Sequence, residues 1–169
     1  MERRLFLTRV LGTAAGATAW RSFAAAPAGA APPVTIEKVV KTEAEWRKIL
    51  TPEQFDVLRQ EGTERPFTSP LNNEKRKGTF VCAGCALPLF DSATKYDSGT
   101  GWPSFYQAIE GRVDSKTDVK LIYPRNEYHC VRCGGHQGHV FDDGPKPTGK
   151  RYCNHGVALK FHLGLASSV

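Results

Sequence analysis

The sequence predicts a mainly β domain that begins with two short helices, and three patterns carry this prediction. Two helix-capping signatures follow one another between residues 42 and 62. From Gly78 onward, short runs of β-branched and aromatic residues alternate with Gly, Pro, Asn and Asp. Two Cys-x-x-Cys pairs lie in this second region, where each is expected at the tip of a hairpin.

The first helix is predicted from a capping box. Thr42 is followed three residues later by Glu45, so each can bond to the backbone N–H group of the other. Trp46, Ile49 and Leu50 then form an apolar stripe.

The second helix is predicted from another capping box. Thr51 is the expected cap, Pro52 takes the first helical position, and Gln54 completes the box. Gly62 is expected to end the helix, because glycine adopts the left-handed conformation common at that position.

The strands are predicted from residues 79–85, 119–124, 127–131 and 138–141. The clearest strand lies near the C-terminus, where one face is apolar and alternates with a second set of residues. The apolar set is Val157, Leu159, Phe161 and Leu163, and the alternating set is Ala158, Lys160 and His162.

The N-terminal segment is predicted to be a targeting signal. Residues 1–30 begin with the paired Arg3 and Arg4, continue with a short run of small and apolar residues, and end in Ala-x-Ala sequences. These are the parts of an export signal, and the paired arginines indicate the twin-arginine type. Residues 31–38 are expected to be a linker and residues 39–165 the domain. The mature protein is expected in the periplasm, or anchored to the membrane if the signal is not cleaved.

The net charge gives little support to nucleic-acid binding. The chain has 23 basic and 17 acidic residues, a formal charge of +6, but four arginines and one glutamate belong to residues 1–30. The remainder has 23 − 4 = 19 basic and 17 − 1 = 16 acidic residues, a charge of +3. A four-thiolate zinc site would lower this by two, so no nucleic-acid partner is expected.

Four of the five cysteines form the pairs Cys82/Cys85 and Cys130/Cys133. Two such pairs supply the four tetrahedral thiolates that zinc prefers, and a closed site of this kind is structural. Three alternatives are a thioredoxin-like redox pair, two structural disulfides and an iron–sulfur cluster. A redox pair expects a βαβ setting, and short loops gain little from disulfides, so zinc is favoured.

Cys153 is the cysteine left over. A buried, inert thiol is the commoner fate of a lone cysteine. Here Arg151 and His155 flank it at alternate positions, which would place all three side chains on one face of a strand. Basic neighbours are expected to lower the pKa of the thiol, so Cys153 is a candidate nucleophile.

Other candidate residues lie in two glycine-rich segments. His136 and His139 are framed by glycines that allow close approach of a ligand, and Trp102 lies in a Gly/Pro-rich loop. Taken alone, each histidine could equally well be a hydrogen-bonded structural residue, and the default interpretation of Trp102 is a core aromatic residue under a turn.

Four blocks, in this order along the chain, resemble the methionine-R-sulfoxide reductases (MsrB). They are TPEQFDVLRQEGTERPF, FVCAGCALPLFDSATKYDSGTGWPSF, CVRCGGHQGHVFDDGP and GKRYCNHGVALKF. The resemblance spans residues 39–161. It implies two antiparallel sheets, one structural zinc ion on the four paired cysteines, and Cys153 as the nucleophile.

The resemblance also implies roles for the remaining candidates. His136 and His139 would face the sulfoxide, Trp102 and Phe141 would hold its methyl group, and Arg151 and His155 would complete the substrate site. The implied reaction converts methionine-R-sulfoxide in peptides or proteins to methionine, through a sulfenic acid on Cys153. The alternative is a non-catalytic zinc-ribbon binding module, and a third interpretation is a disulfide-handling enzyme.

The chain departs from the family pattern at two positions. Thr100 stands where many members have a second, resolving cysteine, so an external thioredoxin-like or small-thiol reductant is expected, acting on a monomer. His155 stands where the family usually has asparagine, while the asparagine of this chain is one residue earlier, at Asn154. The charge of a histidine there would depend on pH.

Overall fold

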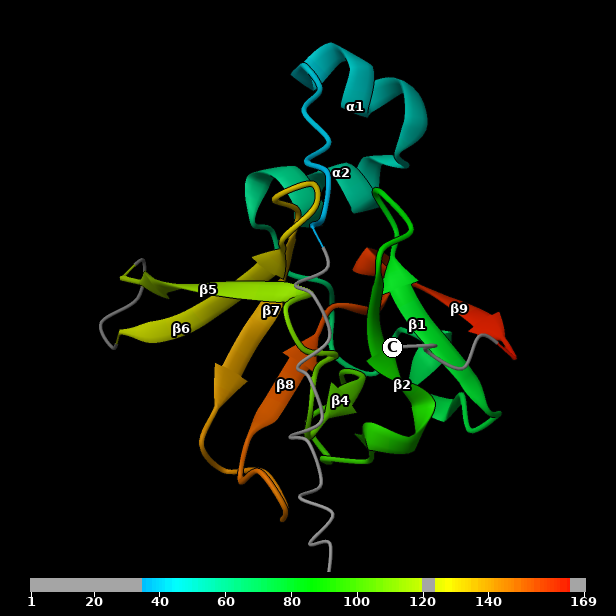
Figure 1. The fold of residues 1–169 in the computed structure, drawn as a ribbon, viewed down its shortest axis with the longest axis vertical. Helices are drawn as coiled ribbons and strands as arrows, with labels where there is room; N and C mark the ends of the chain where they lie inside the picture. The colour runs from blue at the N-terminus through cyan, green and yellow to red at the C-terminus, as the bar shows by residue number, and fades with distance from the viewer. Residues whose placement is uncertain (1–34, 120–123, 165–169) are drawn as a thin grey trace, which may run out of the picture. The chain divides into compact units, whose positions relative to one another are not determined.

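The computed structural model describes residues 35–119 and 124–164 (Figure 1). The expected export signal lies outside these residues, and so do the first part of the linker and most of the strand predicted at 119–124. Residues 35–38 lie against the domain, where Ile36 packs against the core and the Lys38 ammonium donates to the Val131 carbonyl over 2.6 Å.

Two antiparallel sheets form the domain, as the resemblance implied. The smaller sheet has the order β2–β1–β9, from Pro88–Asp91, Gly78–Cys82 and Leu159–Leu163. The larger sheet has the order β3–β4–β8–β7–β6–β5. Its strands are β3 Lys95–Tyr96, β4 Ser104–Phe105, β5 Val113–Asp118, β6 Arg125–Cys130, β7 His136–Phe141 and β8 Arg151–Asn154.

The two predicted helices are confirmed. They are α1 (Glu43–Ile49) and α2 (Pro52–Gln60), and both capping boxes are present. In Figure 1 they lie together at one end of the sheets. Three short 3₁₀ turns, η1 Pro70–Asn73, η2 Ser92–Thr94 and η3 Gly156–Ala158, join other elements.

Two details of the helix predictions are wrong. Ile49 is 55 % exposed, because the short helix α1 turns only Trp46 toward the core, while Leu50 follows it at the C-cap. The left-handed residue that ends α2 is Glu61, with φ 57°, one position before the expected Gly62.

The C-terminal strand begins later than its alternation suggested. Val157 belongs to η3, and the strand starts at Leu159. Leu163 is 62 % exposed, although it belongs to the predicted apolar set, because it pairs with Gly78 at the end of the sheet. Alternation therefore identified the strand but not its ends.

Aromatic side chains fill the core between the sheets. Phe80 and Phe90, from the small sheet, both contact Phe105, with ring centroids 4.9 Å and 4.2 Å away. Phe90 also contacts Tyr128 and Tyr152 of the large sheet, at 6.1 Å and 5.8 Å. Burial of such rings and their edge-to-face contacts hold one face of each sheet inward, which leaves the other face of the large sheet available for a site.

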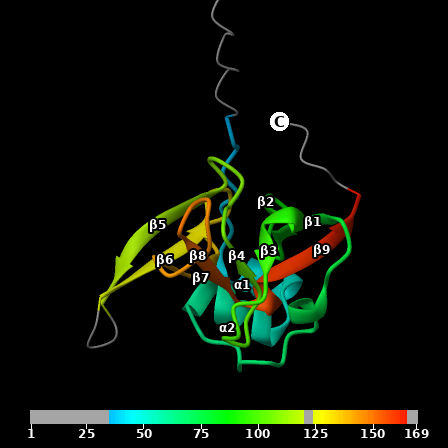
Figure 2. The ribbon, with the colours of Figure 1, turned by 90° about the horizontal axis from the view of Figure 1, so that it is seen from below.

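The far edge of the large sheet is a long hairpin. β5 and β6 extend away from the rest of the domain (Figure 2), with six Cα pairs between Val113/Cys130 and Asp118/Arg125. Within residues 35–119 and 124–164, no helix has the length and apolar character needed to cross a membrane.

Candidate active site and metal centre

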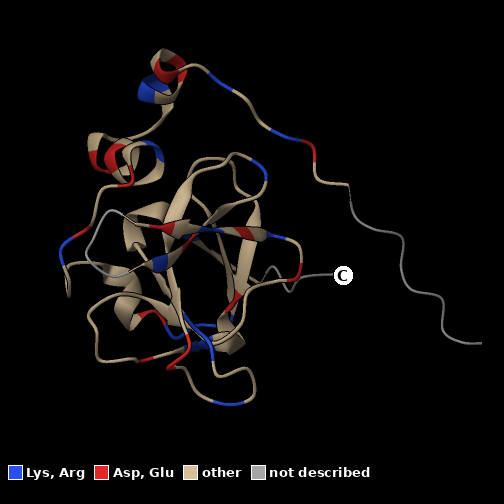
Figure 3. Ribbon diagram, turned by 90° about the vertical axis from the view of Figure 1, so that its left-hand side faces the viewer, with Lys and Arg blue, Asp and Glu red and all other residues tan. Residues whose placement is uncertain are grey.

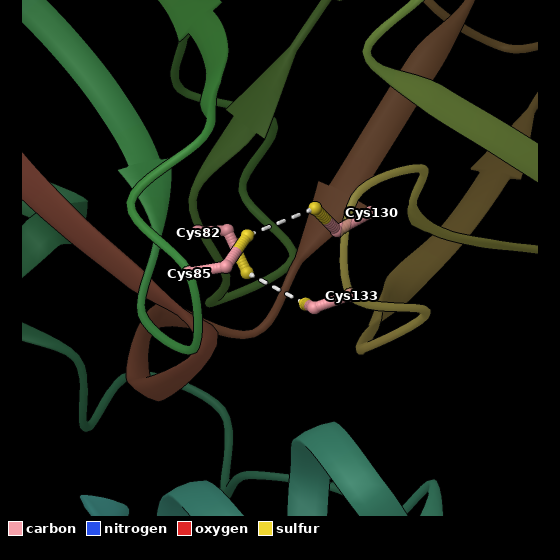
Figure 4. Close-up of side chains that lie close together, drawn as sticks. All are labelled: Cys82, Cys85, Cys130 and Cys133. Atoms are coloured by element: carbon pink, nitrogen blue, oxygen red, sulfur yellow. Dashed lines mark hydrogen bonds between the residues drawn. The ribbon is translucent and has the colours of Figure 1, made fainter. Parts of the chain in front are cut away.

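Four cysteines form a compact sulfur cluster. The Sγ atoms of Cys82 and Cys133 are 3.6 Å apart, those of Cys85 and Cys130 are 3.5 Å apart, and all four lie within 4.8 Å of one another. Figure 4 shows the two side chains of one turn facing the two of the other. Covalent pairs are excluded at these distances, because a disulfide bond is about 2.05 Å long.

The spacing of the sulfurs fits a zinc ion. Tetrahedral thiolates at a Zn–S distance of about 2.3 Å would lie about 3.8 Å apart. The neighbouring sulfurs, that of Cys130 foremost, together with burial raise the pKa of the Cys82 thiol well above its ordinary value. Four thiolates so close together therefore need a cation. Gln137 adds a hydrogen bond to the sulfur cluster, because its amide Nε2 donates to Cys82 Sγ over 3.4 Å.

The two cysteine turns have the same backbone geometry. The residue after each pair, Ala86 or Gly134, has a positive φ of 58° or 67°. Its N–H group donates over 2.8 Å to the carbonyl of the first cysteine of the pair, Cys82 or Cys130. The turns follow β1 and β6, which belong to different sheets, so a metal here would join the two sheets.

A row of polar residues crosses the large sheet on the face that carries Cys153. In antiparallel pairs, directly opposed residues project to the same face. Ser104 and His139 both oppose Cys153, from β4 and β7. The row continues to the sheet edges, and from β3 to β5 it reads Tyr96, Ser104, Cys153, His139, Glu127 and Lys116.

A bulge in β7 brings the second histidine to this face. His136 and His139 are three positions apart, so in a regular strand they would project to opposite faces. The register shifts between Tyr128 and His129 of the partner strand, and Gln137 is the extra residue on β7. An extra residue reverses the alternation, which turns His136 to the side of His139 and Gln137 to the sulfur cluster.

The predicted site residues form a continuous arc of rings. The Trp102 and His155 centroids are 6.5 Å apart, those of His155 and His136 5.5 Å, and those of His136 and His139 5.6 Å. Phe141 follows at 6.5 Å from His139. The structure thus brings together all seven predicted residues outside the metal cluster, namely Cys153, His136, His139, Trp102, Phe141, His155 and Arg151.

The expected lowering of the thiol pKa is wrong in its net direction. Burial raises the pKa of Cys153 above the ordinary value for a thiol, and this effect exceeds the lowering by the Thr100 hydroxyl and the Arg151 guanidinium. Thr100 Oγ1 lies 4.0 Å from Cys153 Sγ. The sequence showed the basic neighbour but not the partial burial of the thiol.

Arg151 is held by two neighbours. Its guanidinium donates to both carboxylate oxygens of Asp143 over 2.8 Å, and its Cζ lies 4.3 Å from the centre of the Phe141 ring. The contact orients the ring, since a guanidinium over an aromatic face is attractive. A positive charge is thereby fixed two residues from Cys153 on the same strand face.

His155 is uncharged near neutral pH. Burial lowers its pKa to about 3, with smaller contributions from the positive charges that His136, His139 and Arg125 can carry. The expected pH-dependent charge in the working range is therefore wrong. Its Nδ1 accepts from the Glu64 N–H group over 3.4 Å, which leaves the proton on Nε2.

Asn154 does not replace His155 at the site. It is fully buried on the other face of the strand, where its Oδ1 accepts from the Tyr128 hydroxyl over 2.6 Å. Its Nδ2 donates to the His155 carbonyl over 2.9 Å. Asn154 thus stabilises the turn that presents His155.

Glu64 is a site residue that the sequence analysis did not identify. Its carbonyl accepts from Trp102 Nε1 over 3.0 Å, and its carboxylate accepts from the Gly156 N–H group over 2.5 Å. Together with its bond to His155, it connects the Trp102 loop to the turn after Cys153. Its position in the TERPF segment was the available signal, but its partners lie between 38 and 92 residues away in the sequence.

Comparison with known proteins places these features in a family. Residues 50–163 match the SelR domain. The chain is 57% identical over 124 residues to the peptide methionine sulfoxide reductase MsrB of Methanosarcina barkeri, which covers 73% of this chain and 87% of the relative.

Two further relatives extend the match. The MsrB of Leptospira interrogans is 54% identical over 125 residues, 73% of this chain and 95% of the relative. Peptide methionine sulfoxide reductase B1 from the chloroplast of Arabidopsis thaliana is 56% identical over 122 residues, 72% of this chain and 60% of the relative. Every residue of the arc and of the sulfur cluster lies inside the SelR match.

Proposed function

Since the chain belongs to the methionine-R-sulfoxide reductase (MsrB) family, we propose that it reduces methionine-R-sulfoxide in peptides or proteins to methionine. The observation that carries the proposal is the position of Cys153. It is the one cysteine of the five outside the sulfur cluster, and it lies opposite His139 beside the arc of rings.

The reaction is an oxygen transfer from sulfur to sulfur. The thiolate of Cys153 attacks the electron-poor sulfoxide sulfur to form a transient S–S bond, and the sulfoxide oxygen takes up a proton. The S–S bond and the S–O bond to the methionine sulfur then break as the hydroxyl group passes to the cysteine sulfur. The oxygen and one proton end on the cysteine as a sulfenic acid, and the thioether of methionine is released. Oxidation of the cysteine balances reduction of the sulfoxide.

The imidazoles of His136 and His139 are the groups suited to deliver that proton, because histidine changes charge near neutral pH. The proposed role of His155 is different, because its neutral ring offers a fixed Nε2–H donor to the sulfoxide oxygen. Trp102 and Phe141, at the two ends of the arc, are proposed to hold the substrate methyl group and so to select one epimer.

A half-buried thiol suits this chemistry if its thiolate is stabilised locally. Burial disfavours the charged form, while the Thr100 hydroxyl and Arg151 favour it. The proposed role of Arg151 is therefore electrostatic, and its pairing with Asp143 holds the charge in place.

Zinc is the proposed cofactor, one ion per chain, held by Cys82, Cys85, Cys130 and Cys133. It would supply structural cross-linking of the two sheets, since four protein ligands leave no position for substrate. The predicted twin-arginine signal agrees with this proposal, because that route exports folded proteins and would allow thiols to bind metal before they meet an oxidising compartment.

The sulfenic acid is proposed to be reduced by an external thiol, either a thioredoxin-like protein or a small molecule. The other four cysteines belong to the sulfur cluster, so none is left to form an internal disulfide. Two external thiols would return Cys153 to its reduced state, with release of water and formation of their own disulfide. We further propose a periplasmic monomer, anchored to the membrane if residues 1–30 are retained.

The test is an epimer-resolved assay with dithiothreitol as reductant. The wild-type protein should consume the R epimer of a methionine sulfoxide peptide and leave the S epimer. Cys153→Ser should lose at least about a thousandfold in rate, with the same zinc content and far-UV spectrum as the wild type. Retention of activity by this variant would reject the proposal and favour a binding module instead.

A further inference from the structure

Each of the two site histidines is bonded to a buried carboxylate on the β5–β6 hairpin. His136 Nδ1 lies 2.7 Å from Glu127 Oε1, and His139 Nε2 lies 2.8 Å from Asp118 Oδ2. The carboxylate side chains are only 4% and 9% exposed. Figure 3, which looks onto this side of the domain, shows acidic and basic segments close together on the strands.

Each carboxylate is also paired with a cation. Lys116 Nζ lies 3.0 Å from Glu127 Oε2, and Arg125 Nη2 lies 2.7 Å from Asp118 Oδ2. The hairpin thus supplies one cation and one carboxylate to each of the two histidines on β7. Both histidines belong to the arc of rings beside Cys153.

These bonds decide which ring nitrogens can serve the substrate. An ionised carboxylate only accepts hydrogen bonds, so the nitrogen that faces it must carry a proton. His136 therefore has its proton on Nδ1, and Nε2 is left for the site. His139 has its proton on Nε2, and Nδ1 is left.

We propose that Glu127 and Asp118 are positioning residues, which fix the tautomers of His136 and His139 and stabilise the imidazolium that protonates the sulfoxide oxygen. The inference rests on the proposed reductase function. Held in this way, a neutral imidazole presents a lone pair to the site. It becomes a donor only after taking up a second proton, and the carboxylate behind it stabilises the resulting charge.

The charges around His136 act in opposite directions. Burial lowers its pKa, and the hydrogen bond and charge of Glu127 oppose this effect. Glu61 also favours the charged form, while His139 disfavours it when protonated, and Lys116 partly neutralises Glu127. His155 is the remaining titratable group in ring contact with His136. Loss of the Glu127 charge should therefore lower the pKa of His136 further.

The first experiment measures the protonation state and tautomer of each histidine ring directly, by nitrogen-15 NMR of the full-length protein. In Glu127→Gln, the protonation midpoint of His136 should move to lower pH. In Asp118→Asn, the proton of His139 should no longer be held on Nε2, which the nitrogen-15 shifts of the ring report. The kcat/KM at pH 7 should fall about tenfold in each variant. The NMR result does not need turnover, so it separates failure of this inference from failure of the reductase assignment.

Lys116→Met should shift the protonation midpoint of His136 in the opposite direction. Lys116 is 53% exposed on its side chain, so its replacement should not prevent folding. Without its ammonium, the full charge of Glu127 acts on His136, and the protonation midpoint should move to higher pH. A merely structural role for the pair would not produce opposite shifts from its two members.

Asp114→Asn is the matched control. Asp114 is an exposed carboxylate on the same strand, and it opposes His129 rather than a histidine of the arc. This variant should keep the wild-type NMR midpoints and kcat/KM. Lys116→Met and Asp118→Asn test the proposal even if Glu127→Gln does not fold. The proposal is overturned if both of these variants leave the protonation midpoints and the tautomers of the histidines unchanged.

Discussion

Cys153 and His139 are directly opposed on the antiparallel strands β8 and β7, so their side chains project to the same face of the large sheet. The residue before His139 is Gly138, and a Cβ atom at that position would lie 1.9 Å from the Cys153 carbonyl oxygen. The close approach of strands β7 and β8 beside these two residues is therefore built into the backbone. It depends on a residue without a side chain.

Gly138→Ala should destabilise the protein and abolish activity together. The added methyl group must push β7 away from β8, and such overpacking costs about 3 kcal/mol. Gly111→Ala is the control, because Gly111 has φ 68° but open space around it, so only a backbone cost of about 1 kcal/mol is expected. Urea unfolding checks the difference, and equal losses would show that the contact with Cys153 is not tight.

Thr100→Val should make the thiol harder to ionise. The Thr100 hydroxyl lowers the pKa of Cys153, so its loss moves the pKa higher. The rate of alkylation by iodoacetamide should then rise at higher pH than in the wild type. Thr100→Ser keeps a hydroxyl and should retain the wild-type curve. An unchanged curve for the valine variant would mean that Thr100 does not stabilise the thiolate.

His155 should make the protein less stable in acid. Its pKa is about 3 in the folded state, against about 6.5 in an unfolded chain. The unfolded state therefore binds more protons below pH 6.5, and stability is lost as the pH falls from about 6.5 toward 3. Between pH 7 and pH 5 this amounts to about 2 kcal/mol.

His155→Asn should remove that part of the pH dependence. The free energy of unfolding, measured with urea at pH 7 and pH 5, should fall about 2 kcal/mol less in the variant than in the wild type. An equal fall in both proteins would show that His155 takes up its proton without unfolding. Activity with the R epimer should persist, since the asparagine amide is also a neutral donor.

Cys85→Ser and Cys153→Ser each replace a cysteine sulfur by oxygen, but only Cys85→Ser should affect zinc binding and stability. Cys85→Ser should lower the zinc content and the melting temperature, because it removes one of the four proposed zinc ligands. Cys153→Ser should keep both at wild-type values. Metal analysis and calorimetry check this pair. Full zinc content in Cys85→Ser would remove the proposed metal site.

Local features of the fold could be predicted from the sequence. The capping boxes of Thr42 and Thr51 act within three residues, so the sequence alone identifies both helices. The cysteine turns are local as well. The exposure of Ile49 and of Leu163 depends on where the elements end against the rest of the domain, and alternation does not contain that information.

The sequence identified seven residues that the structure brings together around Cys153, but it did not identify Glu64 or the electrostatics of the site. The bulge at Gln137, which brings His136 beside His139, is a property of strand pairing. The bonds of Glu127 and Asp118 to these histidines likewise depend on the β5–β6 register. Burial reverses the expected direction for the pKa of Cys153 and removes the expected charge of His155. Each of these requires contacts between distant segments.

The most direct test of Cys153 as the oxygen acceptor is intact-mass analysis after one turnover without reductant. The account predicts that the wild-type protein, mixed with one equivalent of methionine-R-sulfoxide peptide, gains the mass of one oxygen atom. Digestion should place this oxygen on Cys153, with the other four thiols unmodified. Loss of two hydrogen atoms, which marks an internal disulfide at Cys153, would contradict it.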